Sequence, residues 1–276
     1  MPLIRIGVIH MTKKITALLL TVAMIFSMAV SFTGCSNDEE IMSEYMDILA
    51  QEAVSEEEIE AKITDMETFI EKNLKKLSEK ESDYVLYTYI ELAHEKIGAD
   101  ADTFNTWFEA NGPYISEMMR EIIELEFVEV TEPSDDYLHA GGEAFWELLM
   151  IRAFAIEALI SKYQMALATP EYEYLKANLT WYYEYYVNYM ITGNADRPIF
   201  TYDKGKFNEY AQSAYLRGAQ SNPDTATAWA INEFFDYLNS IGYELNYKDA
   251  EESKIYYDTC AYIKKEAAKR VYQQEQ

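Results

Sequence analysis

Apolar residues recur along most of this chain at spacings of three and four, the spacing that places side chains on one face of an α-helix. Ile41, Tyr45, Ile48 and Leu49 show the pattern near the start of the acidic part of the chain. The sequence contains only 10 Gly and 6 Pro, so breaks between helices are few and short. No segment has the two-residue alternation of a strand. We therefore expect an all-α protein, either a multi-helix bundle or an array of helical hairpins, with about eight to nine helices.

Capping residues and helix breakers set the expected helix ends. Ser55 followed by Glu58 is a capping box that begins a helix, and Gly98 tolerates the left-handed backbone that ends one. Asp102 is expected to cap a short helix, and Ser134 or Asp135 to begin another. The expected longer helices cover about 37–50, 55–74, 83–97, 115–128, 144–167, 170–191, 205–219, 224–240 and 249–272.

The segment 144–167 is apolar on almost every side, which is typical of a helix at the centre of a bundle. It is not a membrane span, because Glu147, Arg152 and Glu157 lie on different sides of it and each would be costly in lipid. The longest irregular stretch is 192–204. We expect a helical bundle over 35–191, an irregular connection over 192–204, and C-terminal helices over 205–276 packed on the same domain.

The N-terminal region has the pattern of a signal peptide. Lys13 and Lys14 precede an uncharged stretch, 15–34, that ends in small residues, and we expect translation to start at Met11. The residues Phe32-Thr33-Gly34 before Cys35 resemble the lipobox of bacterial lipoproteins, although Phe32 replaces the usual leucine-like residue. The resemblance implies cleavage after residue 34, acyl chains such as palmitate on Cys35, and a location on the outer face of the bacterial cell membrane. An uncleaved transmembrane helix is the alternative, because about 20 apolar residues also span a bilayer.

The charge balance limits the possible partners. The chain has 23 basic and 48 acidic residues, and removing 1–34 takes away three basic residues and no acid, which leaves a formal charge of −28. The negative electrostatic field of such a chain repels nucleic acids and anionic lipid head groups. Nucleic acid is therefore not an expected partner, and attachment to the membrane depends on the lipid anchor.

Two carboxylate–histidine pairs are candidate metal ligands. Glu91 and His94 lie one turn apart on an expected helix, and Asp136 and His139 have the same spacing. The pairs resemble those of carboxylate-bridged di-iron bundles, which also need two further glutamates. The sequence does not single these out, and one pair has Asp in place of Glu. Phosphate loops, Rossmann glycines and a nucleophile elbow are absent, so we expect neither a cofactor nor an enzyme, with a metal-binding bundle or metal-dependent enzyme as the alternative.

The most unusual part of the sequence is the run LTWYYEYYVNYM at 179–190. In a helix, its rings cover more than half of the circumference. They either pack between helix layers or form a partly exposed binding platform. The candidate binding residues are Tyr174, Trp181, Tyr182, Tyr185 and Tyr186.

These observations together predict a lipid-anchored extracytoplasmic helical protein that acts as a binding or interaction module. An envelope protein, a peptide or a glycan would be the partner. A structural accessory of a cell-envelope complex is a further alternative. Cys260, in a helical pattern, is expected to be a small buried side chain.

Overall fold

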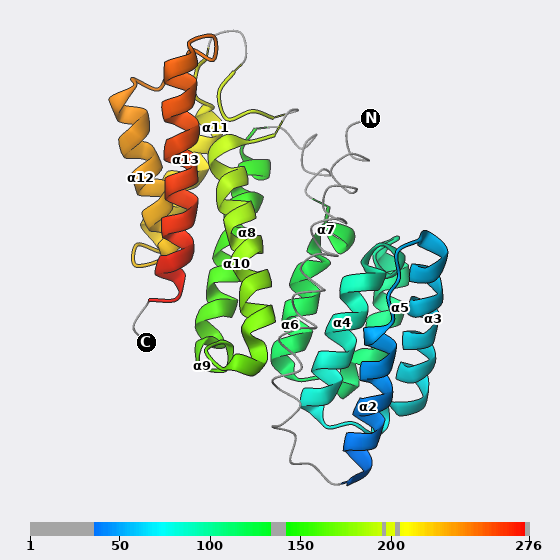
Figure 1. Ribbon diagram of the computed structural model, residues 1–276. Coiled ribbons are helices and arrows are strands. Elements are labelled where there is room, and N and C mark those ends of the chain that lie inside the picture. The colour runs from blue at the N-terminus through cyan, green and yellow to red at the C-terminus, as the bar shows by residue number, and fades with distance from the viewer. Residues whose placement is uncertain (1–35, 134–141, 195–196, 202–204, 274–276) are drawn as a thin grey trace. The chain divides into compact units, whose positions relative to one another are not determined.

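The computed structural model describes residues 36–133, 142–194, 197–201 and 205–273 (Figure 1). Within these residues the chain forms twelve α-helices and no β-strand, so the predicted all-α fold is confirmed. Pairing of the β type is limited, in the described part, to three isolated β-bridges. None of the described helices is long and apolar enough to cross a membrane. The apolar stretch 15–34 lies outside the described residues.

The helix bounds follow the sequence pattern closely. The helices are α2 (Ser36–Ala50), α3 (Glu56–Asn73), α4 (Glu79–Ile97), α5 (Ala101–Asn111), α6 (Glu117–Glu126), α7 (Val128–Thr131), α8 (Glu143–Lys162), α9 (Gln164–Leu167), α10 (Glu173–Thr192), α11 (Glu209–Ser221), α12 (Ala226–Ser240) and α13 (Ala250–Val271). Short 3-10 turns cover Leu74–Lys76, Gly112–Tyr114 and Pro170–Tyr172. The predicted capping box at Ser55 is present, with both reciprocal hydrogen bonds formed.

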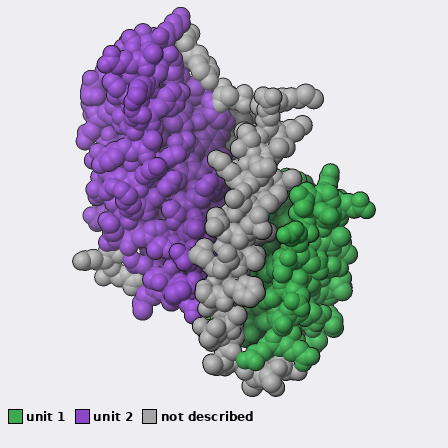
Figure 2. All heavy atoms as spheres, in the orientation of Figure 1, with its two compact units in different colours: residues 1–116 green, residues 117–276 purple. Residues whose placement is uncertain are grey.

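The chain folds as two compact units, residues 1–116 and 117–276, which Figure 2 colours separately. The sequence predicted an irregular connection at 192–204, with the C-terminal helices packed on the same domain. The described part of that segment lies within the second unit, where Ile199 and Phe200 are fully buried. Two adjacent apolar side chains therefore hold this irregular segment in the core, because exposing them to water would be unfavourable.

The first unit packs α2, α3, α4 and α5 around a core that includes Tyr45 and Phe69. The Tyr45 hydroxyl donates a hydrogen bond of 2.9 Å to the carbonyl oxygen of Val85 in α4. Lys62 of α3 is also buried, and its ammonium donates to the carbonyls of Leu49 (2.7 Å) and Gln51 (2.9 Å). These carbonyls lie at the C-terminus of α2, where a cation is favourable. Lys62 thus fixes the end of α2 to α3.

The second unit is built around α8 and α10, which run side by side (Figure 1). Helices α6, α11, α12 and α13 also contact α8, so the prediction that this apolar segment lies at the centre of a bundle is confirmed. Phe145, Trp146 and Leu149 of α8 are fully buried.

Candidate functional site

The aromatic helix α10 has a buried side and an exposed side. Leu179, Tyr183 and Tyr186 lie in the core, whereas Trp181 and Tyr185 are 45% and 43% exposed. A helix rotates about 100° per residue, so these two positions, four apart, share one exposed side of α10. Tyr174 and Tyr182 are half-buried. The structure therefore brings Trp181 and Tyr185 together at the surface and places Tyr186 inside.

The rings of Trp181 and Tyr185 stack, with their centroids 5.6 Å apart and their planes 15° from parallel. Tyr182 meets Trp181 edge-on at 4.9 Å, and Tyr189 meets Tyr185 at 5.8 Å. Edge-to-face and offset-stacked contacts of this kind are favourable beyond the area that they bury. We call this set, Trp181, Tyr182, Tyr185 and Tyr189, the α10 aromatic surface. Tyr174 is near Tyr172 at the start of the helix, with ring centroids 6.4 Å apart.

Tyr186 is a core residue that ties α10 to α7 and α8. Its hydroxyl donates a 2.8 Å hydrogen bond to Glu129 and accepts one from the Arg152 guanidinium at 3.5 Å. Arg152 also forms an ion pair with Glu129 and donates to the carbonyl oxygen of Glu132. Desolvation raises the pKa of Tyr186 to about 12, and burial lowers the pKa of Arg152. Tyr186 is therefore a support beneath the aromatic surface rather than a contact residue.

Glu157 of α8 is a second buried charged residue, and its carboxylate caps the N-terminus of α12. Its carboxylate accepts hydrogen bonds from the backbone nitrogens of Ala226 (2.6 Å) and Thr227 (2.9 Å), the first residues of α12. The Thr227 hydroxyl donates to the same carboxylate at 2.6 Å. A carboxylate at a helix N-terminus is favourable because the first-turn amides have no partner within the helix. Glu157 thus stabilises the fold and is not a free acid for catalysis.

The candidate metal ligands are only partly described. Glu91 and His94 lie on α4 in the first unit and are half-buried. Asp136 and His139 lie outside the described residues, as does Cys35. Among the residues that the structure does describe, no group of three or more His, Cys, Asp or Glu side chains could hold a metal ion.

Cys260 is buried in α13, as predicted. Burial raises the pKa of its thiol to about 12, so very little reactive thiolate forms near neutral pH. The Tyr256 hydroxyl acts in the opposite direction by hydrogen bonding. Cys260 is therefore a packing residue in this fold.

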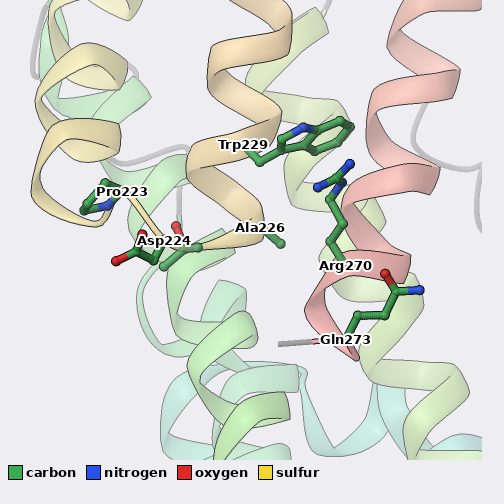
Figure 3. Close-up of a pocket in the computed structure, with 7 residues that line it drawn as sticks. Pro223, Asp224, Ala226, Trp229, Arg270 and Gln273 are labelled. Carbon is green, nitrogen blue, oxygen red and sulfur yellow. The ribbon is translucent and has the colours of Figure 1, made fainter. Parts of the chain in front are cut away.

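The second unit also contains a hollow of about 380 Å³ beside Trp229 of α12 and Arg270 of α13 (Figure 3). No pattern along the sequence predicts this site. Its two main residues lie on different helices, and they meet only because α12 packs against α13. The only feature within one segment is Arg270, a cation in the last turn of a helix. A cation at that position is accounted for by the helix dipole, so it does not indicate a binding site.

Comparison with known proteins found no matching family model, no similar curated protein and no similar solved structure.

Proposed function

We propose that this protein is a lipid-anchored, extracytoplasmic binding module of the bacterial envelope, and that the α10 aromatic surface contacts its partner. The observation that carries the proposal is the exposure of Trp181 and Tyr185, each more than two-fifths accessible on one side of a packed helix. Large rings of this kind dominate protein interfaces, because they supply much contact area and lose little conformational entropy on binding.

The rigidity of the helix below supports this assignment. Tyr183 and Tyr186 anchor the buried side of α10, with the Tyr183 hydroxyl 3.0 Å from the hydroxyl oxygen of Thr227. The exposed rings consequently stand on a backbone that is fixed before any partner arrives. Such preorganisation lowers the entropy cost of association.

The ring stacking favours a protein or peptide over a glycan. Trp181 and Tyr185 lie nearly parallel, so each covers one face of the other. Sugar rings bind aromatic side chains through open faces, whereas protein side chains also pack against ring edges. The exposed edges therefore suit a protein partner with apolar or aromatic contact residues.

The position of α2 supports a membrane-proximal location for the first unit. This helix begins at Ser36, directly after the proposed lipid attachment at Cys35, and Met42 is buried in the core of the first unit. Six residues of helix span only about 9 Å. With Lys62 fixing the other end of α2, a lipid on Cys35 would hold the first unit close to the bilayer without a long tether.

Photo-crosslinking in intact cells tests the contact surface. A benzophenone amino acid replaces Tyr185 in one strain and Tyr257, a more exposed tyrosine of α13, in a control strain. We expect a discrete crosslinked species of higher mass from position 185 and none from position 257. No adduct at 185, or the same adducts at both positions, would reject the α10 aromatic surface as the contact site.

The anchor is tested separately by mass spectrometry of the N-terminal peptide from membrane fractions. We expect Cys35 to be the first residue and to carry acyl chains, and the variant Cys35→Ser to lose them. An unmodified Cys35 in the middle of an uncleaved chain would favour the transmembrane alternative and reject the lipid anchor.

A further inference from the structure

Arg270 is held in place beside the hollow with its binding groups available. Its guanidinium carbon lies 4.1 Å from the centre of the Trp229 ring, and its Nε atom lies 3.5 Å from a carboxylate oxygen of Glu266. Within the described part of the chain, its two terminal nitrogens make no hydrogen bond or ion pair. An arginine stacked on tryptophan loses less rotamer freedom when it binds a ligand than a free one does.

The helix N-terminus beside the hollow contributes no donors of its own. Glu157 accepts from the amides of Ala226 and Thr227, and the Thr225 hydroxyl accepts from the amide of Ala228 at 3.1 Å. The Asp224 carboxylate points away from Arg270 (Figure 3). The guanidinium of Arg270 is therefore the charged group that a ligand in the hollow would meet.

The remaining walls are mixed, with Asp224, Thr225 and Gln273 as polar lining residues beside the apolar ones. Pro223 and Ala226 line the hollow opposite Arg270, and the ring of Trp229 forms its upper wall in Figure 3. A volume of about 380 Å³ falls within the range of small-molecule sites, which begins near 300 Å³. The site therefore offers a planar cationic fork at one side and both apolar and polar contacts around it.

We propose that this hollow binds a carboxylate carried on a small body with both apolar and polar groups, such as the C-terminus of a peptide or an N-acyl amino acid. The two terminal nitrogens of Arg270 match the two oxygens of a carboxylate in a paired hydrogen bond. A singly charged carboxylate suits this protein better than a doubly charged phosphate, because the formal charge of the chain is −25 and repels the dianion more strongly. This site is separate from the α10 aromatic surface and does not depend on it.

Fluorine NMR of the full chain, purified in detergent with 5-fluorotryptophan at its four Trp positions, tests the site directly. Single Trp→Phe variants assign the four resonances. The probes are N-acetylphenylalanine, its neutral amide N-acetylphenylalaninamide, and inorganic phosphate. We expect the acid to shift the Trp229 resonance saturably, and the amide and phosphate to shift it at least about tenfold more weakly.

Two variants of α13 separate a specific site from a general charge effect. Arg270→Gln should weaken binding of the acid by about tenfold or more, and Arg270→Lys, which keeps the charge but loses the fork, should also weaken it. Lys265→Gln removes an exposed charge about 140° around the same helix and should leave binding unchanged. Circular dichroism of each variant confirms that the fold is retained.

Several results would overturn the carboxylate site. The Trp229 resonance could stay unchanged up to about 20 mM acid, a concentration well above that expected for a paired arginine contact. The neutral amide or phosphate could bind as tightly as the acid. Equal losses in Arg270→Gln and Lys265→Gln would likewise assign the effect to overall charge.

Discussion

Neighbouring residues of α10 have opposite roles in this structure. Tyr185 is 43% exposed and Tyr186 is 2% exposed, although the two are adjacent in sequence and chemically identical. The difference comes from the helical rotation of about 100° between them, which directs one ring outward and the other toward α8. Composition alone cannot distinguish them, and both were predicted as binding residues.

Replacing each of these tyrosines by alanine should therefore give very different stabilities. Tyr186→Ala removes a packed ring and leaves the Arg152 and Glu129 contacts incomplete, so we expect a loss of about 3–5 kcal/mol in the free energy of unfolding. Tyr185→Ala should cost about 1 kcal/mol or less, because its ring is largely in water. Urea unfolding followed by circular dichroism measures both. Equal losses would show that the assigned faces of α10 are incorrect.

Glu157 is a buried carboxylate, and its contribution to stability depends on the groups that donate hydrogen bonds to it. Its carboxylate satisfies two amides of α12 and the Thr227 hydroxyl, in a site where it is 2% exposed. Removing one partner from such a group costs more than an ordinary hydrogen bond, because the remaining donors stay buried without an acceptor.

The variant Glu157→Gln should reduce the free energy of unfolding by about 2–4 kcal/mol, because one oxygen becomes an NH₂ group facing a backbone N–H. Glu147→Gln on the same helix is the matched control, since Glu147 is partly exposed and pairs only at 3.8 Å with Arg217. It should change stability by about 0.5 kcal/mol or less. Chemical denaturation measures the free energy of unfolding of both variants. No loss of stability in Glu157→Gln would exclude the capping role.

At the scale of helices, the sequence predicted most of what the structure contains. The apolar spacing located α2, α3, α10, α12 and α13 to within three residues. The single helix expected over 144–167 is two helices, α8 and α9, with a break at Tyr163. The start of α4 was wrong by several residues: Asp83 was expected, but the helix begins at Glu79. The cause is a second capping box, Ser78 with Glu81, which has the same spacing as the one identified at Ser55.

The parts that were not predicted depend on contacts between distant segments. The burial of Phe200 depends on Phe207 and Tyr256, with ring centroids 5.8 and 5.5 Å away. The stacking of Arg270 on Trp229 likewise depends on the packing of two helices. Spacing within one segment carries no information on such contacts, so neither the burial of Phe200 nor the stacking of Arg270 on Trp229 was predicted.

Gly193, which ends α10, should be more costly to replace by alanine than Gly242, because the space around it is filled. Both have positive φ, +69° and +66°, which favours glycine. A methyl group at Gly193 would also overlap the carbonyl oxygen of Arg197, whereas nothing lies within 4 Å of one at Gly242. Gly242→Ala should cost about 1–2 kcal/mol, and Gly193→Ala at least about 1 kcal/mol more. Thermal unfolding compares them, and equal losses would contradict the close approach at Gly193.

At the scale of the whole molecule, buried tyrosines make stability depend on alkaline pH. The chain has 24 tyrosines, and burial raises the pKa of several well above 10, including Tyr45, Tyr183, Tyr215 and Tyr256. For Tyr186 and Tyr237 burial raises the pKa to about 12. A raised pKa means that the folded state holds its proton longer than the unfolded state. The contribution of these buried tyrosines to the free energy of unfolding is complete below pH 10 and is lost as pH rises through about 12.

Titration with base should therefore reveal buried tyrosines that ionise only as the protein unfolds. Phenolate absorbance at 295 nm and helical circular dichroism are recorded together from pH 8 to about 13. We expect one fraction of the absorbance to appear together with loss of the helical signal. A full rise in absorbance while the helices stay intact would contradict the burial of these rings.

For the whole molecule, we propose that a partner covers Trp181 and Tyr185 in intact cells. Hydroxyl-radical footprinting measures this directly, by comparing side-chain oxidation in intact cells with that in the purified protein. We expect Trp181 and Tyr185 to be oxidised in the purified protein and protected in cells, while Tyr257 reacts equally in both. Equal oxidation of Trp181 and Tyr185 in the two samples would contradict a binding role for this surface.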